Sequence, residues 1–190
     1  MSMKLKYLMP LFLLTLQLIF SQNSLSKNIY KLPIKLWQKL SYTTPLLNCQ
    51  FEPSCSNYFI HSVDSIGIIL GTINCANRII RCNPAARHYH LQQEHPKFYN
   101  DNRLIDYVSF AKNKTLNYNF FKYAIIPGLG RYKSDRKVDA MFSFMVITSS
   151  IFKGFELQKQ KPILSGFYFS MTLLFWIADF HNTIYTNNYK

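Results

Sequence analysis

The chain has 190 residues, of which 22 are Lys or Arg and 9 are Asp or Glu, so its formal net charge is +13. A basic balance of this size suits contact with nucleic acid or with an anionic membrane surface. Four cysteines are too few to make a disulfide-rich scaffold by count alone. Because two apolar stretches lie near the C-terminus, we expect membrane lipids and not nucleic acid as the partner.

The N-terminal segment, residues 1–22, has the layout of a secretory signal peptide. Two lysines precede an apolar run from Leu8 to Phe20, and small or polar residues follow from Ser21. The run is short for a membrane-spanning helix. We predict cleavage near Ser21, and an uncleaved N-terminal anchor is the alternative.

Residues 28–44 show the apolar spacing of an amphipathic helix, with lysines between the apolar positions. One interpretation is an ordinary surface helix packed on a core. The other is a helix lying on lipid, with lysines toward headgroups and a tryptophan at the interface. On the second interpretation the lipid-facing candidates are Lys31, Lys35, Trp37 and Lys39.

The stretch "CQFEPSCSNYF" (49–59) places two cysteines around a proline and precedes two further helical segments. Ser54 or Ser56 can cap a helix that runs to Ile66, and Gly67 predicts a bend. A third helix should then reach Arg81 and stop before the Asn-Pro pair at 83–84. So small a three-helix unit has a marginal core, which a staple, a metal or membrane contact would support.

The cysteines allow several uses. Cys49, Cys55 and Cys82, with His88 or His90, could form a zinc set, but five residues between the first two is outside the usual spacing of zinc ligands. In an oxidising compartment, a disulfide between Cys49 and Cys55 or a bridge to Cys82 is the competing use. We predict no metal, no cofactor and no catalytic residue, because recognised nucleophile, phosphate-loop and zinc-protease motifs are missing from the sequence.

The second half of the chain divides into two parts. Residues 91–122 are polar and basic, and we predict a linker with one short helix around Arg103 to Phe110. Two apolar stretches follow, Val138–Phe152 and Ile163–Phe180, and the second would span about 27 Å as a helix. We predict a membrane hairpin within residues 123–190, and a buried hairpin of a soluble domain is the alternative.

Together, the blocks "KLWQKLSYTTPLLNCQFEPSCSNYF" and "RIIRCNP" resemble the YidD family of bacterial membrane protein insertion efficiency factors, also called the haemolytic domain. The resemblance covers about residues 29–84, and Asn83 stands where the family often has histidine. The "IPGLGRY" segment (126–132) and its two apolar helices look like small bacterial membrane modules with a "PGLGQ-x-Y" start. The family motif residues, structural or partner-binding, are Cys49, Pro53, Cys55, Ser56, Tyr58, Arg78, Arg81, Cys82 and Pro84.

The resemblance implies a non-enzymatic factor that assists insertion or assembly of integral membrane proteins beside a YidC-type insertase. A membrane-active, haemolysin-like or lipid-hydrolysing effector is the alternative. The expected location is the bacterial inner membrane, with the domain on the exported face because of the N-terminal signal. The predicted fold is all-α: a signal peptide or anchor (1–22), a small three-helix YidD-like domain (28–90), a linker (91–122) and a C-terminal transmembrane helical hairpin (123–190).

Overall fold

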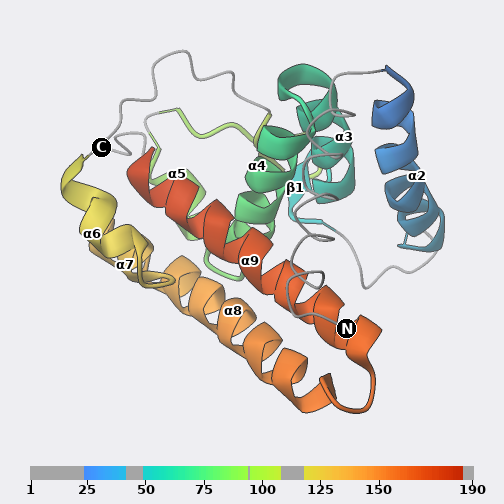
Figure 1. The fold of residues 1–190 in the computed structure, drawn as a ribbon. Helices are drawn as coiled ribbons and strands as arrows, with labels where there is room; N and C mark the ends of the chain where they lie inside the picture. The colour runs from blue at the N-terminus through green and yellow to red at the C-terminus, as the bar shows by residue number, and fades with distance from the viewer. Residues whose placement is uncertain (1–23, 42–48, 94, 108–117, 186–190) are drawn as a thin grey trace.

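The computed structural model describes residues 24–41, 49–93, 95–107 and 118–185, and it is mostly helical (Figure 1). The first part contains the three helices expected from the sequence, α2 (Ser24–Ser41), α3 (Cys55–Ile66) and α4 (Ile68–Arg81), and a short α5 (Ala86–Leu91). Ser54 caps α3 by accepting a 3.4 Å hydrogen bond from the amide of Asn57. The predicted signal peptide lies outside the described residues.

Two short strands join the first part of the chain to the segment predicted as a linker. β1 (Phe51–Glu52) pairs in parallel with β2 (Leu104–Ile105), and Arg103 forms an ion pair with Glu52. The short helix predicted around Arg103 to Phe110 is therefore wrong over its described part. Leu104 is buried beside Phe51, and this long-range pairing outweighs a local helical preference.

The last third of the chain begins with η2 (Tyr118–Phe120), α6 (Phe121–Ala124) and α7 (Leu129–Lys133). It continues in two long antiparallel helices, α8 (Lys137–Leu157) and α9 (Pro162–Ile184), which lie side by side in Figure 1. With 21 and 23 residues, they span about 31 and 35 Å, enough for a hydrocarbon layer of about 30 Å. The predicted pair of long apolar C-terminal helices is confirmed, and by length and composition both could cross a membrane; that they span one stays a prediction.

The hairpin buries small and polar residues and exposes large apolar ones. Ala140, Ser143 and Gly154 of α8 are buried, as are Ser165 and Ala178 of α9. At Gly154 the ring of Phe169 comes so close that an added Cβ would lie 2.8 Å from it. Small residues between helices and large apolar residues outside are the pattern of helices packed within lipid. The large apolar side chains exposed on the hairpin are Met141, Phe144, Met145, Phe152, Phe155, Ile163, Leu164, Phe167, Leu173, Trp176 and Ile177.

Candidate functional site

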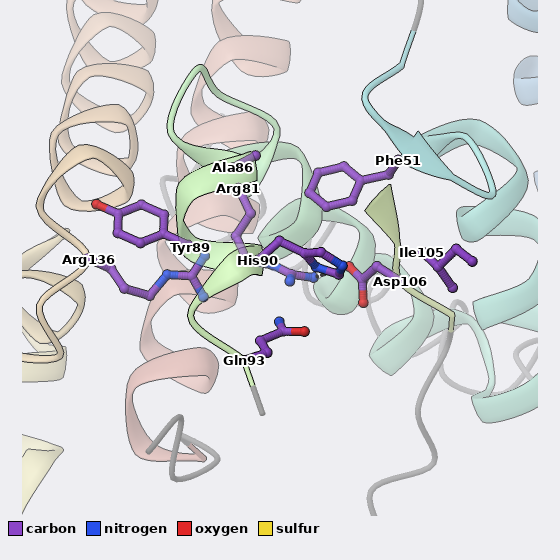
Figure 2. Close-up of a pocket in the computed structure, with 9 residues that line it drawn as sticks. All are labelled: Phe51, Arg81, Ala86, Tyr89, His90, Gln93, Ile105, Asp106 and Arg136. Carbon is purple, nitrogen blue, oxygen red and sulfur yellow. Dashed lines mark hydrogen bonds and ion pairs between the residues drawn. The ribbon is translucent and has the colours of Figure 1, made fainter. Parts of the chain in front are cut away.

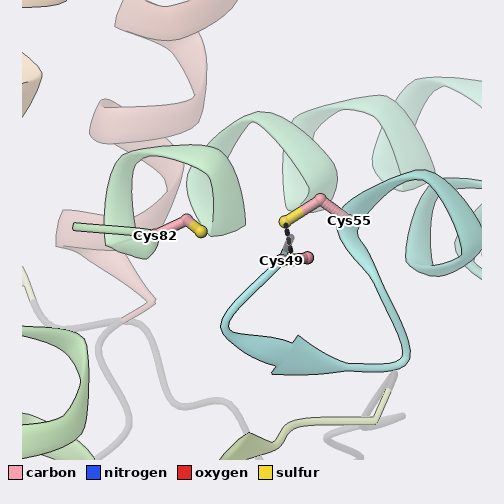
Figure 3. Close-up of side chains that lie close together, drawn as sticks. All are labelled: Cys49, Cys55 and Cys82. Carbon is pink, nitrogen blue, oxygen red and sulfur yellow. Dashed lines mark hydrogen bonds between the residues drawn. The ribbon is translucent and has the colours of Figure 1, made fainter. Parts of the chain in front are cut away.

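Three of the predicted motif residues, Cys49, Cys55 and Cys82, form one cluster (Figure 3). Their sulfur atoms all lie within 4.8 Å of one another, and the Cys49 and Cys55 sulfurs are 3.5 Å apart. Cys49 precedes β1, Cys55 is the first residue of α3 and Cys82 ends α4. All three are half-buried and carry free thiols, so the cluster is a candidate site for thiol chemistry or metal binding.

The three thiols shift one another's pKa values. The pKa of Cys49 lies well below its usual range, chiefly because of side-chain hydrogen bonding with Cys55 and then with Cys82. The pKa of Cys55 is raised in turn, mainly by its hydrogen bond to Cys49.

The fourth cysteine and the two histidines considered as zinc ligands lie apart from this cluster. Cys75 is buried on α4, where its thiol donates to the carbonyl of Cys55 at 3.7 Å, and burial raises its pKa to about 12. His90 contacts the carbonyl of Lys97, and His88 is exposed. Among the described residues, no histidine joins the three thiols as a ligand group.

The motif arginines hold the domain together around an acidic residue that sequence reasoning missed. Arg78 is fully buried between the rings of Phe51 and Tyr58, which lie 4.8 and 4.2 Å from its guanidinium carbon. Its Nε lies 3.4 Å from an oxygen of Asp106, and Arg81 binds the same oxygen at 2.7 Å. Because Asp106 follows β2, its role could not be inferred from the motif blocks.

The same region contains a small cavity of about 40 Å³, shown in Figure 2. A space of this size holds only a few water molecules and is far below the roughly 300–1,000 Å³ of a small-molecule site. Its polar walls indicate a hydrated gap between the domain and the start of the hairpin. The lining residues are Phe51, Arg81, Ala86, Tyr89, His90, Gln93, Ile105, Asp106 and Arg136.

The remaining motif residues have structural positions. Ser56 accepts a 3.1 Å hydrogen bond from Gln38 of α2, and Tyr58 is buried, which raises its pKa. Pro53 is buried and forms a cis peptide bond with Glu52, whereas Pro84 is exposed.

Helix α2 turns its polar side toward α3 and its apolar side outward. Gln38 also bonds to Asn57, and Lys31 pairs with Asp64 at 2.5 Å while remaining only 15% exposed. Lys31 thus faces the domain and not lipid headgroups, in contrast to its place among the lipid-facing candidates. Lys35 and Lys39 are exposed. The outward apolar side chains are Leu32, Leu36, Trp37 and Leu40, each more than half exposed.

A buried polar network joins this domain to the hairpin. Arg131, at the end of the "PGLGR" turn (127–131), binds Asp179 of α9 at 2.5 Å and Asn77 of α4 at 2.6 Å. The left-handed Gly128 donates its amide to the same carboxylate at 2.7 Å. Asp139 of α8 accepts from Asn83 of the domain. The two buried aspartates of the hairpin, Asp139 and Asp179, are thus paired, and they dock the hairpin on the domain.

The sequence comparisons identify the first part of the chain. The family described as "YidD: Putative membrane protein insertion efficiency factor" matches residues 26–90. A Thermotoga neapolitana protein with the same description is 36% identical over 63 residues, which is 32% of this chain and 77% of the relative. The chain belongs to the YidD family. An Aquifex aeolicus member is 38% identical over 60 residues, covering 30% of this chain and 85% of the relative.

No solved structure matches the chain. The cysteine cluster and Arg78–Arg81 lie inside the YidD match, whereas Asp106 and the hairpin lie beyond it. The family is named for insertion efficiency and not for a chemical reaction. Its name and the two apolar helices indicate a membrane-associated factor.

Proposed function

We propose that this chain is a membrane-anchored, non-enzymatic factor that assists the insertion or assembly of integral membrane proteins. The observation that carries the proposal is the docking of a YidD domain onto the base of an apolar hairpin through a buried polar network. Asp139 lies in the first turn of α8 and Asp179 in the last turns of α9, so both anchor points lie at the same end of the hairpin. The domain is thereby held at one membrane surface.

Helix α2 is the contact surface in this proposal. Its polar side binds α3, and the apolar side chains of Leu32, Leu36 and Trp37 on the other side are each more than half exposed. An amphipathic helix with an outward tryptophan and exposed lysines suits the boundary between lipid headgroups and acyl chains. There it would lie beside nascent membrane segments and a YidC-type insertase.

The membrane in which the protein resides, and the side on which its domain lies, are also part of the proposal. We infer residence in the bacterial inner membrane, with the domain on the exported face if residues 1–22 act as an export signal. The hairpin then crosses the bilayer twice, and its connection at 158–161 lies in the cytoplasm. In this proposal α2 acts by contact alone, with its lysines at the lipid headgroups and its apolar side chains at the acyl chains, and no catalytic group takes part.

Site-specific photo-cross-linking in native membranes tests the proposal. A cross-linking residue at Leu36, on the apolar face of α2, should give adducts with lipid and with an insertase or its clients. The same residue at His61, which is exposed on α3, is the matched control and should give few adducts. Equal patterns at both positions, or recovery of the protein in the soluble fraction, would contradict the proposal. Fatty-acid release from defined liposomes by the pure protein would overturn its non-enzymatic part.

A further inference from the structure

The three clustered thiols come from segments that meet only in the folded domain. The loop before β1 supplies Cys49, the start of α3 supplies Cys55, and the residue after α4 supplies Cys82. Figure 3 shows the side chains of Cys49 and Cys55 directed at one another, with Cys82 approaching from the end of α4. A group bound by all three sulfurs would therefore tie together three separate elements.

Sulfur spacing fits a metal ion. In a tetrahedral zinc site with Zn–S bonds of about 2.3 Å, neighbouring sulfurs lie about 3.8 Å apart. The Cys49–Cys55 distance of 3.5 Å is close to this value, and the other pairs lie within 4.8 Å. A disulfide would use only two of the thiols and leave the third unpaired, whereas one metal ion uses all three.

The amino end of a helix lies at the cluster. Cys55 occupies the first position of α3, a twelve-residue helix whose amino end stabilises negative charge, as a metal-bound thiolate carries.

A metal ion bound by the three cysteines would also stabilise the fold of the small domain. Its buried apolar cluster consists of Phe51, Ala86 and Leu104, and the three cysteines pack directly against it. A core this small gives limited stability, and a structural metal is one of the ways in which small domains compensate. The cysteine spacing that argues against zinc in the sequence concerns only the first pair, while the third thiol arrives from 27 positions beyond Cys55.

We propose that Cys49, Cys55 and Cys82 bind one thiophilic metal ion, with Zn²⁺ as the probe ligand and a fourth coordination position open to water or an external donor. Soft thiolate ligands select zinc or copper(I) over magnesium or calcium. Since these three are the only side chains in the ligand group among the described residues, the fourth donor is external to that group. This site is independent of the proposed insertion role.

Cobalt substitution tests the site in the full-length chain, purified in detergent under reducing and oxygen-free conditions. Adding Co²⁺ should produce thiolate-to-cobalt charge-transfer absorption that saturates at one equivalent and disappears when Zn²⁺ is added. Cys82→Ser should weaken binding by more than about 100-fold, since even the loss of outer-shell contacts costs about 10–100-fold. Cys75→Ser, which alters a buried cysteine outside the cluster, should bind like the parent.

Cys82→His keeps a metal-binding side chain and covers the case in which the serine variant does not fold. It should retain binding with weaker charge-transfer absorption, because one thiolate is replaced by imidazole. The absence of that absorption in a folded parent protein would overturn the proposal, as would unchanged binding by a folded Cys82→Ser variant. A metal-free protein isolated natively with a Cys49–Cys55 disulfide would overturn it in favour of oxidation.

Discussion

Asn83 donates a hydrogen bond to Asp139 at 2.5 Å, joining residues 56 positions apart. Asn83 belongs to the YidD motif "RCNP", and Asp139 lies in the first turn of the hairpin helix α8. The asparagine also binds the carbonyl of Ile80 and the amide of Ala85, and it is 1% exposed. Asn83 thus provides a docking contact for the C-terminal extension.

Replacing Asn83 with alanine should loosen this joint. The change removes a donor to the buried carboxylate of Asp139, and leaving a buried polar group unsatisfied costs about 1–3 kcal/mol. We expect earlier unfolding in detergent and faster proteolysis between the domain and the hairpin. Asn100→Ala, at an exposed position, is the control and should behave like the parent. Equal stability of the two variants would mean that the hydrogen bond does not secure the joint.

The Arg131–Asp179 pair gives a second test of the docking network. Both side chains are almost fully buried, and removing one partner of such a pair costs about 3–5 kcal/mol. Asp179→Asn should therefore lower the unfolding temperature strongly. Glu156→Gln breaks the exposed Lys153–Glu156 pair and should leave that temperature unchanged. A small effect of Asp179→Asn would show that Asn77 and neighbouring groups suffice to hold Arg131.

The longer helices, α2, α3, α4, α8 and α9, could be predicted from sequence because their signals are local, whereas the short α5, α6 and α7 were not predicted. The cap at Ser54, the stop before Asn83 and the two long apolar runs all depend on neighbouring residues. The pairing of β1 with β2 could not be predicted in this way, since each strand has two residues and gains its stability from a distant partner. The same holds for the role of Asp106.

The candidate site shows the same division. Motif resemblance selected the cysteines and arginines, and spacing along the chain argued against zinc while leaving a bridge to Cys82 open; folding brings all three thiols within 4.8 Å of one another. Helical periodicity identified α2 as amphipathic yet could not say which side meets the domain. The ion pair between Lys31 and Asp64 decides that question, and it turns the apolar side outward.

The close packing of α8 and α9 predicts an asymmetry between two glycines. A side chain at Gly154 meets the ring of Phe169, whereas an added Cβ at Gly166 meets nothing within 4 Å. Gly154→Val should therefore destabilise the hairpin by about 1–3 kcal/mol, the usual cost of overpacking. Gly166→Val is the matched control, because it introduces the same side chain into a helix. Thermal unfolding in detergent measures both, and equal losses would contradict the observed interface.

Tryptophan fluorescence tests the outward face of α2. The chain has two tryptophans, Trp37 on α2 and Trp176 on α9, so Trp176→Phe leaves one reporter. In liposomes, brominated acyl chains should quench Trp37 and shift its emission to the blue, because an interfacial tryptophan lies close to the acyl chains. Introducing Leu36→Glu into this reporter protein should reduce both effects. Unquenched, water-like emission from Trp37 would show that α2 does not touch the bilayer.

The last prediction concerns membrane orientation, for which charge and export signal give different answers. Counted along the sequence, four basic residues lie before or at the start of α8 (Arg131, Lys133, Arg136, Lys137), three lie near its end or in the connection (Lys153, Lys159, Lys161) and Lys190 follows α9. Since cytoplasmic loops carry the excess of lysine and arginine, this count favours a cytoplasmic domain. An export signal in residues 1–22 favours the opposite arrangement.

The basic residues differ by a small margin between the two sides of the hairpin, and a labelling experiment decides the orientation. Since an export signal would precede every other segment of the chain, we expect it to outweigh this margin and to place the domain outside. The probe is an impermeant maleimide, added to cells whose outer membrane is permeable. Before lysis, it should label the Asn100→Cys variant more than the parent protein. The Gln160→Cys variant, whose new cysteine lies in the connection, should be labelled more than the parent only after lysis. The reverse pattern would place the domain in the cytoplasm, and added labelling of both positions before lysis would mean that the hairpin does not span the membrane.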